Sequence, residues 1–280
     1  LPKFQVKTNF VNITKLDEVE KAITPNTKIL YCETVSNPLL EIADITALSA
    51  LAKKHNILLM VDNTFTPMII SPANLGADIV IHSLTKFING TSDTVAGVIC
   101  GKDDFIVSLS DVNMGAAMLL GPVMDSMRAA SILKNLRTLH LRMKQHSKNA
   151  TYLAEKLNAD GVKLVYPGFK NHPGHDNLKA MMNEEFGFGG MLLLDVGNKK
   201  RAYDLMEMMQ LEKVGYLAVS LGFYKTLFSA PGSSTSSEIP EDERIELGLS
   251  EGLVRMSVGL DNDIERTYQK IKECIDRLGA

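Results

Sequence analysis

The segment GADIVIHSLTKFING, residues 76–90, places a lysine directly behind a strand-like hydrophobic run. The run is DIVIHS, residues 78–83, and Lys86 follows it with Ser83 and Thr85 close by. A surface lysine needs no such setting, but a lysine that must lose its proton is favoured by partial desolvation. The two hydroxyls could hold an anion beside it. We therefore interpret the segment as a buried strand that ends at the site of a reactive lysine.

Strand-like and helix-like patterns alternate around this segment. Thr14 and Asp44 are the predicted N-caps of two amphipathic runs, residues 16–23 and 45–55. The predicted strands are residues 27–33, 57–63, 78–83 and 95–100. Nearly continuous apolar strands that alternate with amphipathic helices indicate a mostly parallel α/β sheet covered on both faces.

The second half of the chain has a different pattern. Residues 119–157 predict one long or broken helix, which Gly161 ends. Short strands are predicted at residues 162–168, 189–197, 217–222 and 253–260, and helices at 199–210 and 263–278, with a loop-rich segment at 228–244. This pattern predicts a smaller α+β domain. We place the boundary near residue 140, with a large domain over 1–140 and a small C-terminal domain over 141–280.

Composition excludes several classes of protein. The chain has 280 residues, 45% hydrophobic and 22% charged, which is the usual balance of a globular enzyme. A net charge of −3 gives no general attraction to nucleic acid or an anionic membrane. No apolar run approaches the roughly 20 residues that span a bilayer. The three cysteines show no metal-binding spacing and suit a reducing compartment, so we expect a cytoplasmic protein.

Polar residues follow the ends of two neighbouring predicted strands. Ligands bind such sheets at the carboxyl ends of the strands, where Asp62, Ser83, Thr85 and Lys86 are expected. A lysine for a Schiff base, hydroxyls for a phosphate and a carboxylate for a protonated ring nitrogen are the parts of a pyridoxal phosphate site. The alternatives are an ordinary surface lysine and an aspartate that caps a turn.

Six segments, in this order, resemble the Cys/Met-metabolism family of pyridoxal-phosphate enzymes. They are YCETVSNPLLEIADI (31–45), LLMVDNTFTP (58–67), GADIVIHSLTKFINGTSDTVAGVICG (76–101), LRMKQHSKNA (141–150), AVSLG (218–222) and GLVRMSVGLD (252–261). The resemblance covers the whole chain and implies fold type I, with a large cofactor-binding domain and a smaller C-terminal domain. It also implies pyridoxal 5′-phosphate as cofactor and no metal.

The resemblance assigns roles to residues on the cofactor side. By motif match, Lys86 is the Schiff-base lysine, and Ser83 and Thr85 are phosphate ligands. Asp62 matches the partner of the pyridinium nitrogen. Asn37 matches the asparagine near the cofactor phenolic oxygen and the substrate carboxylate.

Two further matches concern the substrate. Arg255 matches the arginine that binds the substrate α-carboxylate, and a guanidinium offers the planar fork that a carboxylate accepts. The alternative for Arg255 is a structural salt bridge. Ser220 is expected in the strand that forms the substrate-side wall.

Departures from the family pattern point to a branch. Many members carry HPASMTH-like residues where this chain reads SAPGSSTSSEIP, residues 229–240. This change, and a VDNTFTP segment one residue shorter than the common form, resemble the plant-type methionine γ-lyase branch. The family's N-terminal portion is not found in this sequence, so we expect a preceding segment to be absent from the chain.

The HPGH segment offers two histidines, His172 and His175, which invite a metal interpretation. A surface turn is the favoured reading, because no third ligand is in view. The methionines of LMEMMQ, residues 205–210, follow helical spacing and predict core positions.

The resemblance implies a carbon–sulfur lyase that converts methionine or a related sulfur amino acid to a thiol, 2-oxobutanoate and ammonia. Cystathionine γ-lyase and γ-replacement activity, of the cystathionine γ-synthase or O-acetylhomoserine sulfhydrylase type, remain alternatives within the family. A non-catalytic scaffold is the alternative outside it. The expected partners are a small amino-acid substrate and further copies of the chain, as a dimer of dimers with shared active sites.

Overall fold

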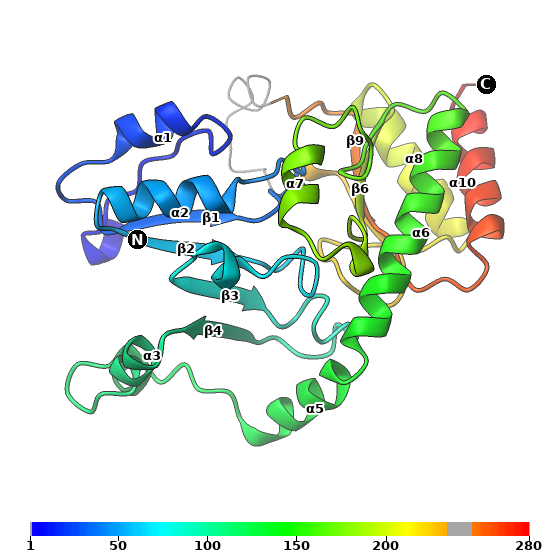
Figure 1. Ribbon diagram of the computed structural model, residues 1–280. Coiled ribbons are helices and arrows are strands. Elements are labelled where there is room, and N and C mark those ends of the chain that lie inside the picture. The colour runs from blue at the N-terminus through cyan, green and yellow to red at the C-terminus, as the bar shows by residue number, and fades with distance from the viewer. Residues whose placement is uncertain (1, 234–247, 280) are drawn as a thin grey trace.

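The computed structural model describes residues 2–233 and 248–279, and it contains two β-sheets joined by a long helix (Figure 1). The first sheet has the order β1-β2-β3-β4. Its strands are β1 (Ile29–Glu33), β2 (Leu58–Asp62), β3 (Ile79–Ser83) and β4 (Gly97–Gly101). The pairs β1–β2 and β2–β3 are parallel, whereas β4 is antiparallel to β3. The prediction of a mostly parallel sheet is confirmed.

One face of this sheet is covered by helix α2 (Ile45–Lys54), which buries Ile45 and Leu48 against Leu59 and Val61. The Asp44 carboxylate accepts a hydrogen bond from the Ala47 N–H at 2.9 Å, so the predicted cap is confirmed.

Helix α1 (Leu16–Ala22) packs beside α2 through Val19. Its N-cap is Lys15, so the prediction of Thr14 is wrong by one residue. The Thr14 hydroxyl bonds the Asn12 side chain instead.

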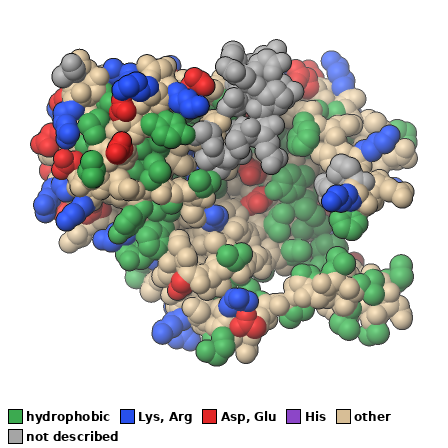
Figure 2. Space-filling model, turned by 180° about the vertical axis from the view of Figure 1, so that it is seen from behind, with side chains coloured by type: hydrophobic (Ala, Val, Ile, Leu, Met, Phe, Trp, Pro, Cys, Tyr) green, Lys and Arg blue, Asp and Glu red, His purple; other side chains and the backbone are tan. Residues whose placement is uncertain are grey.

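The opposite face of the first sheet is open among the described residues. Ile29, Tyr31, Leu58 and Ile99 are each about half exposed, and Figure 2 shows hydrophobic side chains at the surface on the back of the molecule. The expectation that both faces are covered is therefore wrong for the described part of the chain. The apolar strands are those of a two-sided sheet, but on the second side only part of the described surface is covered: Ile79 is buried there, whereas Ile29, Tyr31 and Leu58 stay about half exposed.

The second sheet has the order β5-β6-β9-β8-β7 and is mostly antiparallel. Its strands are β5 (Leu164–Val165), β6 (Met191–Asp195), β7 (Tyr216–Leu217), β8 (Leu227–Ser229) and β9 (Leu253–Ser257). The strand predicted over 217–222 is only two residues long, and Ser220 lies beyond it. The chain turns at Gly222, which has a φ of +73°. The sequence analysis predicts no strand at β8, whose last two residues fall in the loop-rich segment 228–244, and residues 234–244 of that segment lie outside the described part.

The remaining helices are α3 (Asp103–Leu109), α4 (Ala116–Leu120), α5 (Ser126–Leu136), α6 (Leu139–Ala159), α7 (His175–Met181), α8 (Lys199–Leu211) and α10 (Ile264–Leu278), with 3₁₀ turns η1 (Pro2–Phe4), η2 (Pro72–Leu75), η3 (Glu184–Phe186) and η4 (Pro231–Ser233). Among these helices, α5 and α6 match the predicted broken helix and α8 and α10 match the two later predictions, whereas α3 and α7 were not predicted. Gly121, with a φ of +65°, ends α4, and Gly161 follows the end of α6 as predicted.

Helix α6 connects the two halves of the molecule (Figure 1). Its Met143 packs in a cluster with Phe87 and Leu193, while Leu153 packs in the core of the second sheet with Leu192. One cluster thus contains residues next to Lys86 and residues of the second sheet, so the two halves meet around the lysine segment.

The HPGH segment is a surface turn at residues 172–174, as predicted, but His175 departs from this reading. His175 begins α7 and is 7% exposed, its Nδ1 bonds the Pro167 carbonyl at 3.0 Å, and its ring stacks on Phe188. The described residues contain no cluster of metal-ligating side chains. Met206 and Met209 are buried as predicted.

Candidate active site

The carboxyl ends of β2 and β3 bring four of the predicted residues to one edge of the sheet. Asp62 ends β2 and Ser83 ends β3, and Thr85 and Lys86 lie in the turn that follows. This placement agrees with the general position of ligand sites in parallel sheets.

Lys86 is half-buried and points at the segment after β7. Its Nζ donates a hydrogen bond to the Ser220 hydroxyl at 2.9 Å. Burial lowers the pKa of Lys86, and the positive charge of Arg255 lowers it further. The site therefore favours the neutral amine that a nucleophile or base needs.

Arg255 lies in the middle of β9 and is 2% exposed. Its Nη1 donates to the Asn37 side-chain oxygen at 2.8 Å, and its Nη2 donates to the Ser220 carbonyl at 3.2 Å. Burial lowers its pKa to about 10. Among the described residues it has no ion-pair partner, so the expected alternative of a structural salt bridge finds no support there. A buried guanidinium without a carboxylate is costly unless an anion joins it.

Asn37 is held by a residue that the sequence analysis missed. The Glu33 carboxylate accepts a hydrogen bond from the Asn37 N–H at 2.7 Å. Burial raises the pKa of Glu33, and the charge of Asp62 on the paired strand adds to this. Glu33 ends β1 in the register where Asp62 ends β2, and this strand register is the signal that identifies it.

Thr64 is a second missed residue, and it connects Asp62 to Ser83. The Asp62 carboxylate accepts a hydrogen bond from the Thr64 N–H at 2.9 Å. The Thr64 hydroxyl accepts one from the Ser83 N–H at 2.8 Å. Tyr31 lies on the other side of Asp62, with its hydroxyl 3.5 Å from the carboxylate, and burial raises its pKa. No feature of the VDNTFTP segment distinguishes Thr64 from its neighbours as a site residue.

The two predicted phosphate ligands differ in their present partners. Among described residues the Ser83 hydroxyl makes no hydrogen bond, so it is free to bind an anion. The Thr85 hydroxyl accepts from the Ala96 N–H at 3.0 Å and points its proton at the Ala96 carbonyl at a long 3.3 Å. A carboxylate, a free hydroxyl, a lysine with a lowered pKa and an unpaired buried arginine together fit a phosphorylated pyridine aldehyde and an amino-acid carboxylate.

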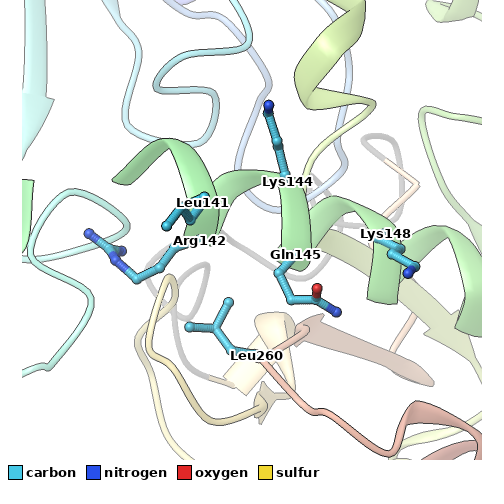
Figure 3. Close-up of a pocket in the computed structure, with 6 residues that line it drawn as sticks. All are labelled: Leu141, Arg142, Lys144, Gln145, Lys148 and Leu260. Carbon is cyan, nitrogen blue, oxygen red and sulfur yellow. The ribbon is translucent and has the colours of Figure 1, made fainter. Parts of the chain in front are cut away.

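Asn37, Lys86, Ser220 and Arg255, predicted from distant parts of the sequence, therefore form one bonded group. A hollow of about 450 Å³ elsewhere on α6 is lined by none of them (Figure 3). In the described ranges no helix is long and apolar enough to cross a membrane.

The sequence model of the family described as "Cys/Met metabolism PLP-dependent enzyme" matches residues 1–272. The chain belongs to this family. The predicted membership is confirmed, and pyridoxal 5′-phosphate is the cofactor on which the family depends.

Three similar family members illustrate the relationship. A protein named methionine gamma-lyase from Arabidopsis thaliana is 42% identical over 275 residues, which cover 98% of this chain and 62% of that protein. Cystathionine gamma-lyase from Bacillus subtilis is 40% identical, covering 99% and 72%. An L-methionine gamma-lyase from Fusobacterium nucleatum is 38% identical, covering 97% and 69%. The chain thus spans less than two thirds of the length of the Arabidopsis protein.

A solved structure supports the fold. A crystal structure of cystathionine gamma-lyase from Lactobacillus plantarum, complexed with L-serine, matches with a TM-score of 0.83 and 33% identity, over 94% of this chain and 69% of that one. The family member described here therefore has fold type I, as predicted.

Proposed function

We propose that the whole protein is a pyridoxal-phosphate-dependent carbon–sulfur lyase that releases the γ-thiol of methionine or a related sulfur amino acid. The observation that carries the proposal is the convergence of Lys86 and Arg255 on Ser220, at 2.9 and 3.2 Å. Lys86 and Arg255 thus meet at Ser220, where the guanidinium could bind the carboxylate of an amino acid and the lysine could remove its Cα proton. The names of the relatives support the same reaction class.

The cofactor would be held by residues at the strand ends. Asp62 would pair with the ring nitrogen, Ser83 and Thr85 would bind the phosphate, and Asn37 would lie near the phenolic oxygen. When bound, pyridoxal phosphate supplies the electron sink that stabilises negative charge at the substrate Cα.

Lys86 would hold the cofactor and then move protons. Its lowered pKa leaves the amine neutral at a lower pH than an exposed lysine, so that it can accept the Cα proton. Removal of one Cβ proton, with donation of a proton from Nζ to the departing sulfur as the Cγ–S bond breaks, would release the thiol. Hydrolysis of what remains gives 2-oxobutanoate and ammonia.

Arg255 would bind the substrate α-carboxylate with the support of Asn37. In the present structure the guanidinium donates to two neutral oxygens, and a carboxylate would offer stronger, charge-assisted hydrogen bonds. Ser220 lies between this group and Lys86, so it would contact the reacting end of the substrate.

The test is turnover by the whole, cofactor-loaded protein with methionine, cystathionine and O-acetylhomoserine. We expect a thiol, 2-oxobutanoate and ammonia from methionine, and loss of more than 99.9% of this activity in Lys86→Ala. Retained turnover in Lys86→Ala, or no product from any of these amino acids with the wild type, would contradict the proposal.

Cleavage of cystathionine is the second candidate, because the Bacillus subtilis relative named cystathionine gamma-lyase is 40% identical. The substrate panel separates methionine cleavage from cystathionine cleavage. A higher kcat/KM for cystathionine than for methionine would make cystathionine the preferred substrate. Thiol incorporation with O-acetylhomoserine would indicate γ-replacement. A scaffold without activity would bind no cofactor at Lys86.

We also infer that the protein assembles as a homo-oligomer, as a dimer of dimers with shared sites. Helices α3 and α4 bury no side chain, and this segment and α5 expose many large apolar side chains: Val107, Val112, Met114, Met118, Leu119, Leu120, Val123, Met127 and Leu133. Such a contiguous apolar surface is typical of an interface. Figure 1 shows α3 beside β4 at the edge of the first sheet, and α5 beyond that sheet at the start of the path to α6.

Two further expectations belong to the proposal. The chain would divide near residue 140 into the cofactor-binding and small domains, since α6 begins at Leu139. The protein would be cytoplasmic, since Cys32, Cys100 and Cys274 are all free.

A further inference from the structure

The segment LRMKQHSKNA, residues 141–150, gives α6 one polar side that binds backbone carbonyls of other segments. Arg142 donates to the carbonyls of Phe87 and Ile88, at 2.5 and 2.7 Å. One turn later His146 bonds the Val258 carbonyl, and Asn149 donates to the carbonyls of Gly259 and Asp261. Residues spaced by four and three lie on one side of a helix. Figure 3 shows Arg142 and Lys144 leaving α6 in different directions, so the neighbouring lysine is not part of this set.

These carbonyls belong to the two segments that carry the proposed chemistry. Phe87 and Ile88 directly follow Lys86, and residues 258–261 follow Arg255 in the chain. Helix α6 therefore holds both segments from the same side. The fit on Arg142 is tight, because a Cβ added to Gly90 would lie 2.5 Å from its guanidinium.

His146 touches both segments with a single side chain. It is fully buried, and its Nδ1 lies 2.7 Å from the Val258 carbonyl oxygen. The edge of its ring meets the Phe87 ring, with centroids 5.2 Å apart and planes at 83°. A carbonyl can only accept, so Nδ1 carries the hydrogen and the tautomer is fixed. Burial lowers the pKa of His146 to about 4, which keeps the ring neutral at physiological pH.

The choice of histidine is hard to explain by packing alone. Its Nε2 is buried and has no hydrogen-bond partner among the described residues, which is a cost that an apolar side chain would avoid. Its gain is the bond to the Val258 carbonyl, which a Phe or Leu could not make. The Val258 N–H is already bonded to the Gly190 carbonyl at 2.8 Å, so the backbone of Val258 is held at both its N–H and its carbonyl.

We propose that His146 is a positioning residue that fixes the spacing between Lys86 and Arg255, with Arg142 and Asn149 supporting it on the same side of α6. The inference rests on the proposed function, in which Lys86 accepts the Cα proton and Arg255 binds the substrate carboxylate. Loss of the spacing leaves carboxylate binding intact and misplaces the base. A misplacement of about 1 Å can cost roughly 100-fold in rate.

The test compares substitutions that move or remove one donor, made in the whole cofactor-loaded protein. His146→Asn keeps an N–H near the place of Nδ1, whereas His146→Gln shifts it toward the place of Nε2, and His146→Phe removes it. The matched control is His175→Phe, because His175 is also buried, bonded through Nδ1 to a carbonyl and packed on a phenylalanine.

We expect His146→Phe and His146→Gln to lower kcat about 10- to 100-fold with less than a threefold change in KM. His146→Asn should recover kcat to within about threefold of the wild type. Hydrogen exchange should quicken together in peptides that cover residues 84–90 and 253–261 in the Phe and Gln variants. The His175→Phe control should change neither kcat nor exchange in these peptides.

Several outcomes overturn the inference. Equal losses of kcat in His146→Phe and His175→Phe would show a general effect of lost stability. An unchanged kcat with faster exchange would show a structural role only, and so would equal behaviour of the Asn and Gln variants. If His146→Phe does not fold, the Asn and Gln pair still decides. An inactive wild type would refute the proposed function, and the exchange data would then decide alone whether His146 couples the two segments.

Discussion

Arg255 is the residue whose surroundings say most about the ligand. A guanidinium that is 2% exposed and bonded only to neutral oxygens in the described structure is poorly compensated for the loss of water. Asn37 and the Ser220 carbonyl fix its plane and leave it facing the residue that Lys86 contacts. The planar fork suits a carboxylate, which lysine could bind only as a point charge.

Arg255→Lys should therefore raise KM about 10- to 100-fold for every amino-acid substrate, since hydrogen bonds to charged groups contribute roughly 1.5–3 kcal/mol each. It should also lower kcat, because the substrate is misoriented. Steady-state kinetics with methionine and cystathionine measure both effects. Arg201→Lys is the matched control, because among the described residues the Arg201 guanidinium donates to the carbonyls of Val196 and Leu278. A near-normal KM in Arg255→Lys would show that another group binds the carboxylate.

Ser83 and Thr85 should separate cofactor binding from stability. Ser83→Ala removes a hydroxyl that is free in the described structure, so it should weaken cofactor binding about tenfold and leave the melting temperature of the apo-protein unchanged. Thr85→Ala should weaken binding and also cost about 1 kcal/mol of stability, because its hydroxyl bonds the Ala96 N–H.

Cofactor titration and thermal unfolding of the apo-protein test both variants. A double variant with unchanged cofactor affinity would place the phosphate elsewhere. A Thr85→Ala protein as stable as the wild type would contradict the role given to the bond with Ala96.

The site residues that sequence could predict are those with distinctive chemistry. Lys86 is a charge directly behind an apolar strand and Arg255 is a charge within one, and both settings are unfavourable for a charge without a function or a partner. Glu33 accepts a hydrogen bond from the Asn37 N–H, and Thr64 donates its own N–H to Asp62. Both bonds depend on strand register and turn geometry, which the sequence does not show. Only the register Glu33↔Asp62, seen in three dimensions, shows that Glu33 can hold Asn37.

At the scale of elements, the turn after β7 is placed against the lysine segment by a glycine. A Cβ on Gly222 would lie 2.3 Å from the Phe87 backbone nitrogen and 2.8 Å from the Lys86 carbonyl carbon. The Gly222 N–H also donates to the Ser257 hydroxyl, two residues after Arg255. This close approach allows Ser220 to reach both Lys86 and Arg255.

Gly222→Ala should push these backbones apart and lower both stability and kcat. The matched control is Gly161→Ala, because Gly161 also has positive φ, +80°, but nothing lies within 4 Å of its added Cβ. The control should lose only about 1–2 kcal/mol of folding stability, which is the cost of placing an alanine in the left-handed region. Urea unfolding and turnover of both variants check this expectation, and equal losses in the two would show that the contact with Phe87 is unimportant.

The elements themselves were predictable where periodicity was long and undisturbed. The helix that begins after Asp44 and the strands that end at Asp62 and Ser83 were found from apolar pattern and cap alone. The direction of β4 was not, because an apolar strand reads the same in either orientation. Strand β7 has two residues, whereas a strand over 217–222 was predicted. The chain turns at Gly222 toward Lys86, and no local sequence pattern reveals that contact.

At the scale of the whole molecule, the apolar surface of α4 and α5 predicts assembly. Met118→Lys combined with Leu120→Lys should shift the protein to smaller species, because two charges would have to be buried in the interface. Leu211→Lys is the matched control, since Leu211 is about as exposed as Leu120 but lies on α8. Sedimentation velocity measures the masses. A double variant with the mass of the wild type would place the interface elsewhere.

The proposed lyase reaction depends most on Lys86 as the residue that binds the cofactor covalently. The direct measurement is borohydride reduction of the cofactor-loaded protein, followed by proteolysis and mass spectrometry of the lysine-containing peptides. We predict that the mass of the reduced cofactor is added to the peptide that contains Lys86, and that Lys86→Arg gives no labelled peptide. A label on another lysine, or no label on the loaded wild-type protein, would contradict the account.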